Sequence, residues 1–241
     1  MYKWLTETPF SHRGLHGSKI EYIENTLSAF HAANAKGHGF ECDILLSKDN
    51  RAMVFHDVDL NRLTDHSGKI QDFTAEQLSK FKLKNSHDTI PTLAKVLTNI
   101  HRNYPILIEI KGDQGKPNVI AQTVYEEIQD YAGPLAIMSF YPDILLWFQK
   151  NAPNVPRGLV ATSINENDMP KEYFSIDMQK SLIDDLNVDF IAYDIKALPN
   201  DVTEYCRDKH IAVLTWTVRT EELRQKAILY TDNSIYENLD L

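Results

Sequence analysis

Two histidines follow short apolar segments, at points where the chain could place them beside a reacting group. His12 is followed by Arg13 and Gly14, and His56 is followed by Asp57. At neutral pH an imidazole has both protonation states within reach, so two histidines can supply a base and an acid. The glycine-flanked Arg13 suits the close approach of an anion. A hydrogen-bonded structural histidine is the alternative for His12, and a capping role is the alternative for Asp57.

Three carboxylates occur within strand-like segments. Glu41 and Asp43 flank Cys42, and Glu109 lies two residues before Lys111. Side chains alternate along a strand, so Glu41 and Asp43 share one face, opposite to Cys42, and Glu109 shares a face with Lys111. Paired inward carboxylates repel unless a positive group lies between them, and Mg²⁺ or Ca²⁺ prefers such ligands. The alternatives are an outward, solvated pair on the first segment and a simple ion pair on the second.

Taken together, these residues have the composition of an acid–base phosphoryl-transfer site with a metal. The two imidazoles would exchange protons with the attacking and leaving oxygens. The carboxylates would hold the cation, while Arg13 and Lys111 would meet the anionic substrate. Three further histidines, His16, His66 and His87, are expected in solvated loops.

The segments that carry these residues belong to an alternation of short apolar runs with longer amphipathic ones, which indicates strands followed by helices. Short strands that are apolar on both faces are typical of a parallel sheet covered by helices. Roughly eight such units predict a (β/α)₈ TIM barrel, whose functional side chains lie at the carboxyl ends of strands. A doubly wound open sheet is the alternative. The expected strands are Phe10–Arg13, Phe40–Leu46, Met53–His56, Ile106–Ile110, Leu135–Ser139, Arg157–Ala161, Phe190–Tyr193, Ile211–Val218 and Ile228–Thr231.

Residues 1–241 are expected to form a single domain. The second and third strands are separated by Lys48-Asp49-Asn50, a turn-forming cluster that predicts a hairpin. Asp57–Thr89 does not fit the alternation, so we expect a small insertion there. A short helix is expected after the last strand.

The composition limits the class of partner. With 25 basic and 34 acidic residues the net charge is −9, which argues against nucleic acid as the main partner. Cys42 and Cys206 are too few for a disulfide scaffold, and no apolar run is long enough to span a membrane. No signal peptide is apparent at the N-terminus. We therefore expect a cytoplasmic protein without stable membrane insertion, and the acidic balance does not exclude one small phosphate ligand.

The order of the motifs resembles the glycerophosphodiester phosphodiesterase family. The residues that carry this resemblance extend over the first 111 positions, with weaker matches beyond them. They are His12-Arg13-Gly14, Glu24-Asn25-Thr26, Ala29-Phe30, Gly39-Phe40-Glu41-Cys42-Asp43, Val54-Phe55-His56-Asp57, Leu60-Asn61-Arg62, Gly68, Ile90-Pro91-Thr92-Leu93, Ile108-Glu109-Ile110-Lys111, Ser139-Phe140 and Trp216-Thr217-Val218.

The resemblance implies a TIM barrel that hydrolyses glycerophosphodiesters to glycerol 3-phosphate and an alcohol. It implies an internal attack by the glycerol 2-hydroxyl, in which one histidine removes a proton and the other protonates the leaving alcohol. The resulting cyclic phosphate is then hydrolysed with the histidine roles exchanged. The roles that it implies are one divalent ion, Mg²⁺ or Ca²⁺, held by Glu41, Asp43 and Glu109, an acid–base pair of His12 and His56, and phosphate contacts from Arg13 and Lys111.

Trp216 could form an apolar wall for the glycerol backbone, with core packing as its alternative role. The chain departs from the family pattern at Ile23, where proline is common, and at Arg219, where asparagine is common. The last strand also lacks the usual glycine-rich segment, which puts the specificity for the alcohol in doubt. Two rival functions are a phospholipase D-like activity on lysophospholipids or sphingolipids and a non-catalytic phosphate-ester binding protein.

Overall fold

Eight parallel strands form a closed ring in the computed structural model, which describes residues 2–17, 22–112, 114–164 and 171–239. The first strand pairs with both the second and the last, so the ring has no open edge. This closure confirms the predicted TIM barrel and rules out the open sheet. The eight strands are β1 (Phe10–Ser11), β2 (Gly39–Leu46), β4 (Ile106–Ile110), β5 (Leu135–Ser139), β6 (Arg157–Ala161), β7 (Phe190–Asp194), β8 (Ala212–Val218) and β9 (Asn233–Tyr236).

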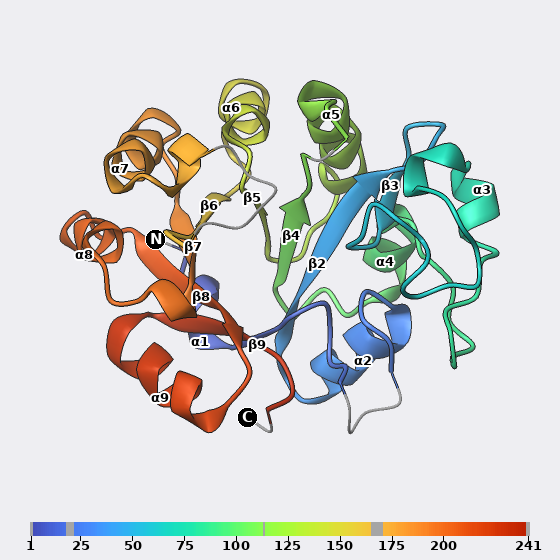
Figure 1. The fold of residues 1–241 in the computed structure, drawn as a ribbon, viewed down its shortest axis with the longest axis horizontal. Coiled ribbons are helices and arrows are strands. Elements are labelled where there is room, and N and C mark those ends of the chain that lie inside the picture. The colour runs from blue at the N-terminus through green and yellow to red at the C-terminus, as the bar shows by residue number, and fades with distance from the viewer. Residues whose placement is uncertain (1, 18–21, 113, 165–170, 240–241) are drawn as a thin grey trace.

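Helices surround the ring, as Figure 1 shows for α5 to α9. Threonine residues cap the N-termini of several helices. At the start of α2 the Thr26 hydroxyl accepts a hydrogen bond from the Ala29 backbone. None of the helices in the described ranges has the length and apolar composition needed to cross a membrane. The helices are α1 (Trp4–Glu7), α2 (Leu27–Ala35), α3 (Ala75–Leu78), α4 (Leu93–Asn99), α5 (Pro117–Ile128), α6 (Pro142–Asn151), α7 (Ile176–Asp185), α8 (Asp201–Asp208) and α9 (Glu221–Tyr230), with 3₁₀ turns η1 (Ile70–Asp72), η2 (Lys171–Phe174) and η3 (Ile195–Ala197).

From β4 to β9, the two faces of each strand contribute to two separate apolar layers. Ile106, Ile108 and Ile110 of β4 pack in the layer between the strands and the helices. Leu107 points the other way, into the barrel interior, where α1 adds Leu5. Side chains alternate along a strand, so Glu109, which lies between the outward Ile108 and Ile110, points into the barrel with Leu107.

The predicted hairpin is confirmed, because β3 (Ala52–Val54) pairs antiparallel with the end of β2. Residues 57–89 then leave the barrel and hold only η1, α3 and isolated bridges. In Figure 1 this segment lies to one side, beyond β3. Its own apolar cluster, which includes Leu60, Ile70 and Leu78, packs against Leu45 of β2.

The predicted last strand, Ile228–Thr231, is wrong. Helix α9 continues through Tyr230, and Ile228 and Leu229 are 62% and 69% exposed on it. The barrel is closed instead by β9, whose Ile235 and Tyr236 are buried. The described residues after β9 contain no helix, so the expected terminal helix is absent from 237–239.

Candidate active site

The carboxylates of β2 and β4 lie side by side in the barrel interior. The strand register places Asp43 opposite Glu109 and Glu41 opposite Leu107. Glu41 and Asp43 are each 1% exposed, and one carboxylate oxygen from each of the three acids lies within 4.8 Å of the others. Cys42 points to the outer apolar layer. The outward-facing alternative for Glu41 and Asp43 is therefore wrong.

Two cations lie against these carboxylates. Lys111 Nζ is 2.9 Å from Asp43 Oδ1 and also contacts Glu109 Oε1, while Arg13 Nε is 3.1 Å from Asp43 Oδ2. Burial raises the pKa of Asp43, but the charges of Lys111 and Arg13 outweigh it and hold this pKa well below the ordinary value. Burial and the neighbouring Asp43 and Glu109 raise the pKa of Glu41 well above its ordinary value. The cluster thus carries more negative charge than its two cations stabilise.

Glu41 provides a test of whether these residues suit a divalent cation. Its Oε2 accepts a hydrogen bond of 2.9 Å from the Arg13 backbone, whereas its buried Oε1 has no hydrogen-bond partner among the described residues. A buried oxygen without a partner is uncommon and calls for a ligand or water. Carboxylate oxygens are the ligands that Mg²⁺ and Ca²⁺ prefer, so Glu41, Asp43 and Glu109 fit such an ion.

His12 is oriented by a carboxylate from the opposite end of the chain. Its Nδ1 lies 2.9 Å from Glu237 Oε2, which also accepts hydrogen bonds from Arg219. Burial raises the pKa of Glu237, but the hydrogen bonds from His12 and Arg219 lower it to about 2, so this carboxylate is ionised and only accepts. Nδ1 of neutral His12 therefore carries the proton and Nε2 is the basic nitrogen. Burial lowers the pKa of His12 to about 4.

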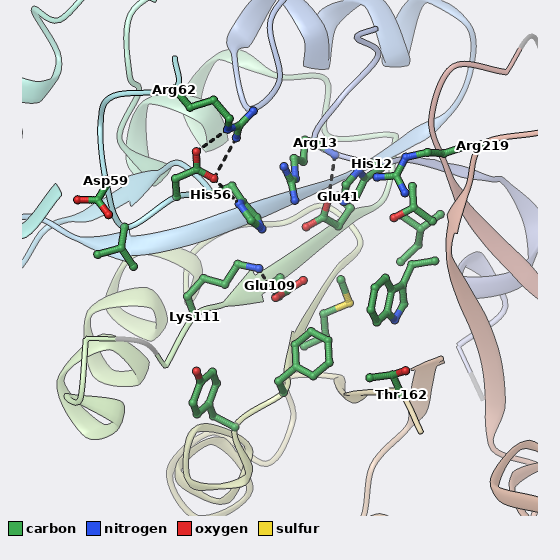
Figure 2. A pocket seen from close by; sticks show the side chains of 18 of the residues that line it. His12, Arg13, Glu41, His56, Asp59, Arg62, Glu109, Lys111, Thr162 and Arg219 are labelled. Carbon is green, nitrogen blue, oxygen red and sulfur yellow. Dashed lines mark hydrogen bonds and ion pairs between the residues drawn. The ribbon is translucent and has the colours of Figure 1, made fainter. Parts of the chain in front are cut away.

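His56 is oriented in the same way by its neighbour in sequence. His56 Nδ1 is 2.7 Å from Asp57 Oδ1, and Asp57 also accepts hydrogen bonds from Arg62. Arg62 reaches Glu24 with two further bonds of 2.7 Å, and Glu24 accepts one of 2.8 Å from Arg13. In the view of Figure 2, His56 and His12 lie on opposite sides of Glu41.

The turn after β1 aims Arg13 at the acidic cluster. Arg13 itself has a φ of 56°, in the left-handed region, and Gly14 follows with a φ of 81°. A side chain at Gly14 would lie 2.8 Å from the Ala29 Cβ, so only glycine fits there. The Asn25 amide donates a bond of 2.9 Å to Asp43 and thereby links the start of α2 to β2.

A pocket of about 740 Å³ opens over these groups. Its lining combines charged groups and both histidines with the apolar side chains of Met138, Phe140 and Trp216. The Trp216 indole donates a bond of 2.8 Å to the Ala192 carbonyl, and its ring centroid is 5.6 Å from that of Phe140. Trp216 therefore lines the pocket while its indole nitrogen is anchored to a neighbouring strand. Asp43 is buried and does not line this cavity. The other predicted site residues all border it: His12, Arg13, Glu41, His56, Glu109, Lys111 and Trp216.

Some partners of the site had no role assigned from the sequence. Glu24 and Arg62 belong to the motifs that resemble the family, and their opposite charges are the only sequence signal that they pair. Glu237 follows β9 directly, so the strand-end rule would have found it had the last strand been placed correctly. His16 was expected to be solvated, but its Nε2 is buried.

Comparison with known proteins agrees with this geometry. The sequence profile of the glycerophosphoryl diester phosphodiesterase family matches residues 12–238. The chain belongs to this family. A glycerophosphodiester phosphodiesterase from Bacillus altitudinis is 33% identical over 172 residues, which span 66% of this chain and 69% of that relative. The predicted family is thus confirmed, and with it an enzyme of the phosphodiesterase class.

Solved structures of this family share the fold. A glycerophosphodiester phosphodiesterase from Thermotoga maritima has a TM-score of 0.75 at 29% identity, covering 94% of this chain and 92% of that one. A phosphodiesterase from Oleispira antarctica, solved with its product sn-glycerol-3-phosphate, has a TM-score of 0.82 at 21% identity, covering 97% and 94%. The similarity extends over nearly the whole barrel.

Proposed function

We propose that this protein hydrolyses glycerophosphodiesters to glycerol 3-phosphate and an alcohol. One observation carries the proposal: in a chain of this family, two imidazoles held by carboxylates border one pocket, beside a cluster of three converging acids. A binding protein would need no pair of proton-exchanging groups, whereas cleavage of a phosphodiester requires a base and an acid.

His12 and His56 would share the proton transfers. The glycerol 2-hydroxyl attacks phosphorus and gives its proton to one imidazole, while the bond to the alcohol oxygen breaks and that oxygen takes a proton from the other. Water then opens the cyclic phosphate with the two roles exchanged, which returns both rings to their first states. Because burial lowers the pKa of His12 to about 4, His12 is neutral at pH 7 and suits the first base.

Glu41, Asp43 and Glu109 would hold one divalent cation, Mg²⁺ or Ca²⁺. When bound, such an ion supplies positive charge for the phosphate oxygens. Arg13 and Lys111 would add to this charge, and they are held beside the pocket by their contacts with Asp43. Trp216 would cover the apolar side of the glycerol backbone.

A coupled dehydrogenase assay for released glycerol 3-phosphate tests this function, with glycerophosphocholine, glycerophosphoethanolamine, glycerophosphoinositol and lysophospholipids as substrates. We expect His12→Ala and His56→Ala each to lower turnover at least ~100-fold, as expected for general acid–base groups. His87→Ala, which removes an exposed histidine of the insertion, is the matched control. Turnover close to wild type in either active-site variant would remove that residue from the mechanism. Release of an alcohol without glycerol 3-phosphate would favour the phospholipase D-like activity.

A further inference from the structure

A second cluster of metal-ligating side chains adjoins the acidic one but has a different chemistry. It consists of His12, His16 and Glu237, and one ligand atom from each lies within 4.8 Å of the others. The His12 and His16 ring centroids are 6.4 Å apart. The cluster offers two imidazoles and one carboxylate, whereas the neighbouring cluster offers oxygen atoms alone.

His16 is held with a free nitrogen in this cluster. Its Nε2 is buried with no hydrogen-bond partner among the described residues. A buried polar atom without a partner calls for a ligand or water, and an imidazole nitrogen is a common ligand for a transition-metal ion.

The loop that carries His16 is packed against the segment that carries Glu237. A side chain added at Gly17 would overlap the Asn238 amide oxygen, at 1.7 Å. On the other side of His16, the Leu15 backbone donates a bond of 2.9 Å to the Ala29 carbonyl. These close contacts keep His16 near Glu237.

We propose that His12 Nδ1, His16 Nε2 and Glu237 form a binding site for a transition-metal ion such as Zn²⁺, separate from the carboxylate site for Mg²⁺ or Ca²⁺. Two histidines and one carboxylate are a common ligand set for zinc with an open fourth position, and imidazole ligands disfavour Mg²⁺ and Ca²⁺. Zinc bonds of about 2.0–2.2 Å require the ligands to approach one another further, which His16 in a loop can accommodate.

Occupation of this site would inhibit hydrolysis. The ion takes the place of the proton that His12 shares with Glu237, so the single proton of neutral His12 moves from Nδ1 to Nε2. Nε2 then has no free electron pair with which to accept a substrate proton. The inhibition rests on the role proposed for His12, but metal binding itself does not.

The guanidinium of Arg219 would compete with a metal ion for Glu237. It donates to Glu237 Oε2 at 3.0 and 3.2 Å, and its side chain is 46% exposed. A cation bound to Glu237 must displace or tolerate this guanidinium. Arg219→Gln should therefore strengthen metal binding, whereas removal of a ligand should weaken it.

Cobalt absorption measures binding without any catalysis. The full-length protein is titrated with Co²⁺ in millimolar Mg²⁺, and Zn²⁺ is then added to displace it. We expect one equivalent of Co²⁺ with the visible bands of a nitrogen-ligated ion, at least tenfold weaker binding in His16→Ala, and tighter binding in Arg219→Gln. His31→Ala, which removes an exposed histidine of α2, should bind as the wild type does. Thermal unfolding of each variant verifies that it is folded, and His16→Asn is a second variant without the imidazole.

Zinc inhibition is measured in parallel with glycerophosphocholine in millimolar Mg²⁺. His16→Ala should need at least tenfold more Zn²⁺ for half inhibition, with unchanged turnover in its absence. Equal inhibition or equal Co²⁺ binding in wild type, His16→Ala and His16→Asn would overturn the site, because the ion would then be bound by the carboxylates alone. If the protein cleaves no glycerophosphodiester, the cobalt titration still decides between these outcomes.

Discussion

The hydrogen bond between His12 and Glu237 determines which imidazole nitrogen can accept a proton. We expect Glu237→Gln to lower kcat at least ~10-fold with little change in KM, because an uncharged amide does not fix the tautomer or stabilise the imidazolium. Steady-state kinetics on glycerophosphocholine measure the effect, and Glu237→Asp, which keeps the charge, should recover part of it. An unchanged kcat in Glu237→Gln would show that His12 needs no carboxylate.

Burial of His12 also makes the stability of the protein depend on pH. The pKa of His12 is about 4 in the fold against an ordinary 6.5, so between these values the unfolded chain binds the extra proton. His12 therefore lowers the free energy of unfolding as pH falls from about 6.5 to 4, and has no further effect below that. His12→Gln should have a flatter Tm–pH curve in this window than wild type. Parallel curves for the two proteins would contradict the buried, neutral state of His12.

At the scale of single elements, strand parity accounts for much of the site that could be predicted. Alternation predicted that Glu41 and Asp43 share one face of β2, but it left open whether that face points inward. The register of β2 and β4 brings these two acids to Glu109. The partners across the molecule were not predictable in this way. Glu237 lies 225 residues from His12, and no local pattern relates two positions that far apart.

The misplaced last strand has a specific cause. Ile228 and Leu229 form an apolar run like those of the true strands, yet they lie exposed on α9. The Thr220 side chain begins this helix by accepting a bond from the Leu223 backbone, and this capping signal identifies it better than hydropathy does. The true strand β9 contains Asn233, whose amide donates to the carbonyls of Leu5 and Thr8.

The turn between β1 and α2 can be tested through its glycine. Gly14→Ala should lower the free energy of unfolding by about 2–4 kcal/mol, because its φ of 81° is strained for alanine and its Cβ would lie 2.8 Å from that of Ala29. Gly37 has the same φ of 81° but open space around it, so Gly37→Ala is the matched control and should cost less. Denaturant unfolding compares the two. Equal losses would show that the contact with α2 is unimportant.

For the whole molecule, roughly eight short, mostly apolar strands followed by helices predicted the barrel but left a doubly wound open sheet as the alternative. The contacts that close the ring, β1 with β9, join the two ends of the chain and follow from the fold and not from any local pattern. A single domain over residues 1–241 and a cytoplasmic location stay predictions.

Cation binding should stabilise the whole barrel in a pH-dependent way. Burial and the neighbouring Asp43 and Glu109 raise the pKa of Glu41 well above its ordinary value, and an ion binds the deprotonated carboxylate, so affinity should rise with pH. At about 100-fold excess over Kd, Mg²⁺ or Ca²⁺ should raise Tm by about 5–10 °C. Thermal unfolding at pH 6 and pH 8 should show the larger shift at a given concentration at pH 8, and Glu41→Gln should reduce both. A shift that is independent of pH and of Glu41 would place the ion elsewhere.

The most direct test is the release of glycerol 3-phosphate from glycerophosphocholine before and after metal removal. Three acids that converge around one cation predict that EDTA abolishes release and that Mg²⁺ or Ca²⁺ restores it in the wild type but not in Glu109→Gln. Full activity in EDTA, or restoration of Glu109→Gln to the wild-type rate, would contradict a catalytic centre built on these carboxylates.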